Sequence, residues 1–119
     1  MQPEALIAAA GKAYVDHRIY TIKPRKMAEF IDVFDRLAMP ILLSTLGSPL
    51  GFWVSHVGPL NQFVHLWGYD SLADYEQRCL KRDAHPDFPA YFSASEHLVV
   101  AQETRLIKRL VLPSMGAPT

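Results

Sequence analysis

The chain has a single cysteine, no excess of charge of either sign and no long apolar run. One thiol, Cys79, cannot form an intramolecular disulfide and suits a reducing compartment, so the expected location is cytoplasmic. Twelve basic and twelve acidic side chains give a formal net charge of zero, which predicts no nucleic-acid partner. No segment approaches the ~20 apolar residues that a spanning helix needs, so no membrane partner is expected.

The chain also lacks the common signatures of a cofactor. Its six glycines are dispersed and form no phosphate-binding loop. Its five histidines show neither the His-x-His nor the His-x-x-x-His spacing of a metal site. The sequence therefore predicts no cofactor and no metal, and two alternatives stay open: a cross-strand metal site built from His56, His65 and Glu103, and haem held by a histidine.

The length of 119 residues predicts one domain. We expect this domain over residues 14–113, with an N-terminal extension over 1–13 and a C-terminal tail over 114–119. In the extension, the acidic Glu4 precedes the apolar stretch and no basic segment does, which disfavours a secretory signal.

Apolar periodicity predicts strands over residues 13–22, 50–57, 62–69 and 98–112. A long amphipathic helix begins at Lys26, and we expect Pro40 to kink it or end its regular part and Gly47 to stop it. Either Asp70 or Ser71 is expected to cap a second helix, and Ser71 and Asp74 have the spacing of a capping box. Residues 84–89 break that helix, and a short further helix through residue 94 is interpreted as a spacer.

This order of elements predicts the fold class α+β, a ferredoxin-like βαββαβ arrangement with a four-stranded antiparallel sheet. The helices would cover one face of the sheet and leave the other face bare. Because a bare apolar face is unfavourable in water, we expect a second copy of the chain to cover it, which makes the chain a homodimer.

Successive strand side chains point to opposite faces, so residues 63–69 divide into two sets. The aromatic set consists of Phe63, His65, Trp67 and Tyr69. The aliphatic set consists of Val64, Leu66 and Gly68. We expect the aliphatic set to pack on the helices and the aromatic set to line a cavity on the opposite face.

The same region resembles the NIPSNAP family, whose pattern is Gly-Pro-x-Asn-x-x-x-His-Leu-Trp-x-Tyr-Asp-x-Leu. The matching residues are Gly58, Pro59, Asn61, His65, Leu66, Trp67, Tyr69, Asp70 and Leu72. A weaker resemblance runs over residues 14–113, which is one family domain. Two positions depart from the pattern: His17 stands where an aliphatic residue is usual, and Tyr75 stands where an arginine is usual. The resemblance implies a dimeric α+β barrel, and it implies no single activity.

Three side chains are candidates for catalysis: His65, Arg18 and Tyr20. A histidine, a cation and a phenol in one cavity could bind a carboxylate or enolate oxygen and move a proton. The alternatives are structural: a histidine bonded to a carbonyl or a tyrosine, and an Arg18 that pairs with Asp16 or Glu103. Phe63, Trp67 and Tyr69 are the candidate ligand-binding residues.

The predicted function is the binding of a small apolar or aromatic metabolite in this cavity. The sequence leaves open whether the metabolite is also transformed; an enzyme of this kind would be a cofactor-independent oxygenase, an isomerase or a lyase. The alternative function is a homodimeric interaction module without catalysis, whose aromatic face only buries the dimer interface.

Overall fold

The computed structural model describes residues 11–115 of the chain. The strands are β1 (Tyr14–Ile22), β2 (Pro49–Val54), β3 (Gln62–Tyr69) and β4 (Val99–Lys108). The helical elements are α2 (Met27–Val33), the π-helical turn η1 (Phe34–Ala38), α3 (Met39–Thr45), α4 (Leu72–Asp83), α5 (Phe88–Ser95) and the 3₁₀ turn η2 (Pro113–Met115). The prediction about a secretory signal concerns residues 1–12, of which residues 1–10 lie outside the described residues.

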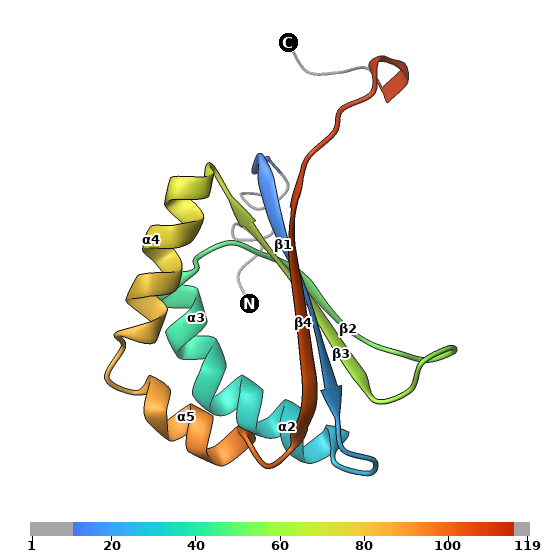
Figure 1. The fold of residues 1–119 in the computed structure, drawn as a ribbon, viewed down its shortest axis with the longest axis vertical. Helices are drawn as coiled ribbons and strands as arrows, with labels where there is room; N and C mark the ends of the chain where they lie inside the picture. The colour runs from blue at the N-terminus through green and yellow to red at the C-terminus, as the bar shows by residue number, and fades with distance from the viewer. Residues whose placement is uncertain (1–10, 116–119) are drawn as a thin grey trace.

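The sheet is antiparallel with strand order β2-β3-β1-β4, and the helices lie on one side of it (Figure 1). This arrangement confirms the predicted α+β, ferredoxin-like fold. It places β1 and β3 at the centre of the sheet and β2 and β4 at its edges.

The first helical segment does not end at Pro40. The chain passes from α2 through the π-helical turn η1 into α3, and Pro40 is the second residue of α3. A proline lacks the N–H that would bond one turn back, and its ring crowds that turn. A wide π turn directly before the proline relieves this crowding, so the helix continues.

The predicted helix ends are confirmed at Gly47 and Ser71. Gly47 has φ +91° and donates its N–H to the carbonyl of Leu42 at 3.0 Å, and a Cβ there would lie 2.8 Å from the guanidinium of Arg78. Ser71 caps α4 by accepting the N–H of Asp74 at 3.0 Å. The Asp74 carboxylate in turn accepts from Arg78 at 2.8 Å, so the cap and the ion pair together fix the start of α4.

The aromatic set of β3 faces the helices, which reverses the predicted orientation. The Phe63 ring centroid lies 5.2 Å from that of Phe30 in α2 and 4.8 Å from that of Phe34 in η1. Trp67 and Tyr69 are fully buried in the same layer. Alternation separates two faces without identifying the inner one when both are apolar. The larger rings take the inner face because they bury more apolar area beneath the helices.

The opposite side of the sheet carries no helix from residues 11–115 (Figure 1). We call the partly or largely exposed apolar residues on this side the bare face: Ile19, Trp53, Val64, Leu66 and Ile107. Val15 lies on the same side, next to Ile107, but is buried. Strand pairing sets Val64 directly between Ile19 and Trp53, and the Trp53 side chain is half exposed. The alternative in which the aromatic set, with Trp67 and Tyr69, buries the dimer interface is therefore wrong, because those rings are buried within one chain.

Between residues 11 and 115, no helix combines the length and the apolar character needed to cross a membrane.

Trp67 offers a direct test of the core. Replacing it with alanine removes a fully buried indole and should lower the free energy of unfolding by about 3–5 kcal/mol, as measured by urea denaturation. The control is Leu80→Ala on the outer side of α4, where the side chain is exposed and the expected change is within about 0.5 kcal/mol. A Trp67→Ala loss as small as that of the control would contradict the packing described.

Candidate ligand-binding cavity

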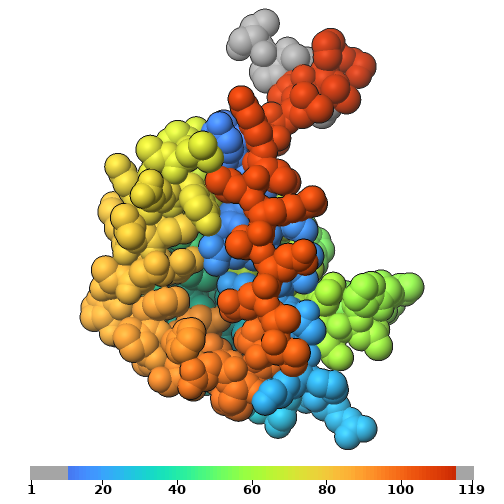
Figure 2. All heavy atoms as spheres, in the orientation of Figure 1, coloured from blue at the N-terminus to red at the C-terminus, as the bar shows by residue number. Residues whose placement is uncertain are grey.

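A cavity of about 400 Å³ lies between the sheet and the helices α4 and α5. Figure 2 shows the hollow, with β4 on one side and the two helices on the other. The cavity is on the face that the helices cover, and not on the opposite face where the sequence placed it.

The cavity lining combines charged, hydrogen-bonding and apolar side chains. Its polar members are Arg18, Tyr20, His65, Arg82, Tyr91, Ser95, Glu96 and Gln102. Its apolar members include Phe34, Leu42, Leu46, Phe88, Phe92, Val99 and Val100. A few polar groups set in an apolar wall are typical of small-molecule sites.

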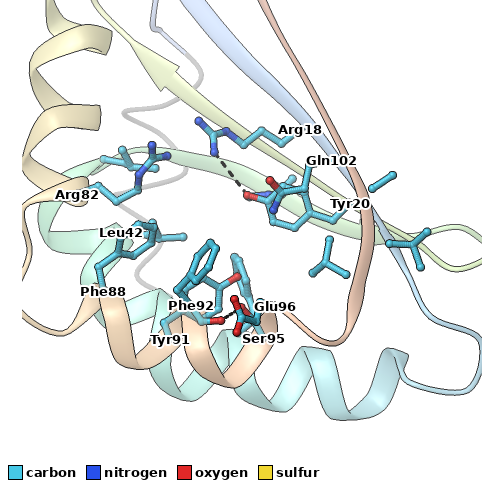
Figure 3. A pocket seen from close by; sticks show the side chains of 16 residues that line it. Arg18, Tyr20, Leu42, Arg82, Phe88, Tyr91, Phe92, Ser95, Glu96 and Gln102 are labelled. Carbon is cyan, nitrogen blue, oxygen red and sulfur yellow. Dashed lines mark hydrogen bonds between the residues drawn. The ribbon is translucent and has the colours of Figure 1, made fainter.

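The structure brings the three catalytic candidates together at the cavity wall. Arg18 in β1 and His65 in β3 are direct cross-strand partners. The Tyr20 ring centroid lies 4.8 Å from that of His65, and Arg18 Nη1 donates a long hydrogen bond of 3.5 Å to the Tyr20 hydroxyl (Figure 3). All three lie on the helix-facing side of the sheet, whereas Ile19 belongs to the bare face.

Arg18 is held in place by the buried carboxylate of Asp16. Arg18 Nε donates to Asp16 Oδ2 at 2.7 Å, and Thr104 Oγ1 donates to Asp16 Oδ1 at 2.6 Å. Burial lowers the pKa of Arg18, but the Tyr20 phenol and the Asp16 carboxylate more than offset this effect and raise the pKa overall. Arg18 therefore stays charged. Of its two predicted partners, Asp16 is confirmed and Glu103 is not, because Glu103 lies opposite Ile19 on the other side of the sheet.

His65 is a neutral side chain enclosed by rings, with 1% of its surface exposed. Its Nδ1 accepts a hydrogen bond from Trp67 Nε1 at 2.8 Å. Its Nε2 is buried and has no hydrogen-bond partner in the described part of the chain. Burial, and then the positive charges of Arg18 and Arg82, lower the pKa of His65 to about 3. A pKa this low keeps the imidazole neutral near pH 7, so His65 acts there as a hydrogen-bonding group, and its catalytic role stays a prediction.

The region from α4 to α5 supplies cavity residues that the sequence interpretation missed. Phe88, Tyr91, Phe92 and Ser95 recur at i, i+3, i+4 and i+7 of α5 and all line the cavity. This spacing marks one face of a helix and could have identified them. The segment therefore forms one wall of the cavity in addition to joining α4 to β4. From the end of α4, Arg82 joins this wall (Figure 3), with its guanidinium carbon 5.8 Å from the Phe88 ring centroid.

The predicted ligand-binding residues Phe63, Trp67 and Tyr69 are not among the residues that line this cavity. Phe63 instead borders a smaller hollow of about 280 Å³ together with Phe52. Tyr69 packs edge-on against Tyr75 with centroids 5.1 Å apart, and burial raises the pKa of its hydroxyl. Of these three rings, Trp67 contacts the cavity-lining His65 through its indole N–H.

The cross-strand metal alternative does not assemble. His65 faces the helices, Glu103 lies on the opposite side of the sheet, and His56 is in the exposed loop after β2. Within residues 11–115, no three His, Cys, Asp or Glu side chains lie close enough together to hold a metal ion.

The sequence and the fold of this chain are similar to those of known proteins. The NIPSNAP family model matches residues 15–112. A NIPSNAP-like domain protein from Burkholderia xenovorans is 32% identical, with TM-score 0.79, over 83% of this chain and 86% of that one. A cofactor-independent oxygenase from Streptomyces nogalater, 20% identical with TM-score 0.58 over 87% of this chain and 99% of that one, shares the fold alone.

A human relative, Protein NipSnap homolog 3A, is 39% identical over 62 residues. The match covers 50% of this chain and 24% of the human protein. The chain therefore spans about a quarter of that relative's length.

The low pKa of His65 has a consequence for stability. The imidazole has a pKa of 6.5 when unfolded and about 3 when folded, so between these values the unfolded chain binds the extra proton. The contribution of the neutral His65 to the free energy of unfolding is fully present above pH 6.5. It is lost progressively as the pH falls from about 6.5 towards about 3. Between about pH 7.5 and about pH 5.5, His65 should remove about 1.4 kcal/mol from the free energy of unfolding, measured by urea denaturation. His65→Gln keeps the other four histidines and should lack this loss; an equal loss in both proteins would contradict the assignment.

Proposed function

This chain belongs to the NIPSNAP family, and on that premise we propose that it binds a small amphipathic anion in the cavity between the sheet and helices α4 and α5. The anionic group would lie near Arg18 and Arg82. The apolar body, aliphatic or aromatic, would lie against the ring-rich wall of α5.

The observation that carries this proposal is that two guanidinium groups, those of Arg18 and Arg82, line one cavity. Both lower the pKa of His65. Arg18 is paired with Asp16 and Arg82 with the exposed Asp83, and the lining also includes Glu96, so an anion would bind through the N–H groups that these pairs leave free. A guanidinium binds carboxylate and similar planar anions through paired N–H groups. The volume of about 400 Å³ falls within the range of roughly 300–1,000 Å³ that is usual for small-molecule sites.

The apolar part of the lining supports an amphipathic ligand rather than a bare inorganic ion. Phe34 and Leu42 form the deep wall, and Phe88 and Phe92 of α5 form the outer wall. Contact with these side chains would remove apolar ligand surface from water, which contributes about 25 cal/mol per Å². Proton transfer by His65 is not part of the proposal, because its pKa of about 3 keeps it neutral.

Two fluorescent dyes of the same shape and different charge test the proposal. Anilinonaphthalenesulfonate is an anion, and N-phenyl-1-naphthylamine is its uncharged relative. We expect Arg82→Gln to weaken binding of the anion about tenfold and to change binding of the uncharged dye less than about threefold, since one charge-assisted contact is lost.

The same loss is expected for the double variant Asp16→Asn with Arg18→Gln, which removes the cavity-side charge without leaving a buried carboxylate unpaired. The control is Arg36→Gln, because Arg36 is exposed and pairs with Asp32 within its own helical segment. The proposal fails if the anion binds the wild-type protein no better than the Arg82 variant, or if Arg36→Gln has the same effect.

We also propose that a second copy of the chain covers the bare face. Ile19, Trp53, Val64 and Leu66 form a continuous apolar group across the three strands β1, β2 and β3. A contiguous apolar group on an uncovered sheet face favours an interface, and a twofold pairing would bury the same residues on both copies. We further propose that the family domain spans residues 14–113. The single cysteine supports a reducing compartment, and we propose a cytoplasmic location.

Sedimentation tests the pairing. Leu66→Lys introduces a charge on the bare face and should convert a dimer at micromolar concentration into a monomer, because pairing would bury an unpaired charge on each copy. The matched control is Leu80→Lys on the outer side of α4, which should leave the sedimentation coefficient unchanged. A wild-type protein that already sediments as a folded monomer would contradict the pairing.

A further inference from the structure

A hydrogen-bond donor of His65 is unused inside the cavity wall. His65 lines the cavity, is 1% exposed, and has no partner for Nε2 within residues 11–115. Buried polar groups in folded proteins are nearly always paired, so an unpaired one in a cavity is a candidate for contact with a ligand. The buried carboxylate of Asp16 is not a second candidate for a ligand contact, because its two oxygens already accept hydrogen bonds from Arg18 and Thr104.

Trp67 determines which nitrogen of His65 carries the proton. An indole N–H can donate a hydrogen bond and cannot accept one. Because Trp67 Nε1 donates to His65 Nδ1 at 2.8 Å, Nδ1 must be the acceptor nitrogen. In the neutral imidazole the proton is then on Nε2, which becomes a donor of fixed direction.

We infer that the cavity recognises a hydrogen-bond acceptor oxygen of the ligand, as in a ketone, a carboxylate or an enolate, through His65 Nε2–H, and that Trp67 is the positioning residue for this contact. The inference rests on the proposed binding function and adds the chemical class of the atom bound. A hydroxyl can rotate to accept this bond, but an ammonium or amide N–H placed there would meet another donor. The site thus discriminates by hydrogen-bond direction as well as by charge.

An uncharged pair of ligands separates this contact from the effect of the arginines. 2-Acetonaphthone has a carbonyl oxygen, and 2-isopropenylnaphthalene has a methylene group of similar size in its place. We expect the ketone to bind at least about tenfold more tightly than the alkene, measured by displacement of N-phenyl-1-naphthylamine.

Two substitutions of His65 serve as matched variants. The side-chain amide of His65→Gln can present an N–H near the position of Nε2 and should retain most of the ketone preference. His65→Met fills similar space without a donor and should bind both ligands equally. A wild-type protein that shows no advantage for the ketone, whether it binds both ligands or neither, overturns the inference. The anionic-dye experiment with the Arg82 variant tests the proposed function separately. The proposed function therefore stands if only the ketone preference is absent, and it fails if the dye experiment fails.

The role of Trp67 has a readout that packing alone does not move. In the ¹⁵N NMR spectrum of the wild-type protein, His65 should show a pyridine-like Nδ1 and a pyrrole-like Nε2. Trp67→Phe removes the donor, so the tautomers should mix and the ketone preference should narrow. A wild-type spectrum with the proton on Nδ1 overturns the assignment even where the Trp67 variant fails to fold.

Discussion

The packing of the sheet's aromatic side chains against α2 and η1 is the constraint on which the other features depend. Phe63 and Tyr20 both contact Phe30, with centroids 5.2 and 6.2 Å apart. Once these rings occupy the inner face, strand alternation sends Val64 and Ile19 to the outside. The same packing draws His65 and Arg18 to the inner side, where α4 and α5 leave room for the cavity. The bare face and the cavity thus both follow from the orientation of the aromatic side chains towards the helices.

Two buried polar groups in this layer differ in how completely they are paired. The Asp16 carboxylate accepts from Arg18 and from Thr104, so the cost of its burial is offset within the chain. His65 is paired on one nitrogen only among the described residues. Asp16 therefore has a structural role in holding Arg18, whereas the free nitrogen of His65 leaves a bond to be made. The contrast is the physical reason to assign recognition to His65 and support to Asp16.

Local signals in the sequence predicted the order of the elements well. Ser71 and Gly47 act through bonds to residues close in the chain, so their roles can be inferred without the fold. The orientation of β3 could not be inferred in this way, because both of its faces are apolar. Which face packs on the helices depends on the side chains that α2 and η1 bring against the sheet, and these are distant in the sequence. Arg18, Tyr20 and His65 were predicted to meet because they share one face of paired strands. Arg82 was missed because it reaches the cavity from a helix that follows them in the chain.

The alternation within β3 also keeps the two proposed surfaces chemically separate. His65 lies on the helix-facing side of β3 and lines the cavity, while its neighbours Val64 and Leu66 lie on the bare face. A substitution on one side therefore removes no side-chain contact on the other, although the two sides share a backbone held by β1 and β2. Loss of pairing through Leu66 and loss of recognition through His65 are consequently distinguishable outcomes. The ligand-binding proposal and the dimer proposal can therefore fail independently, because they rest on different residues.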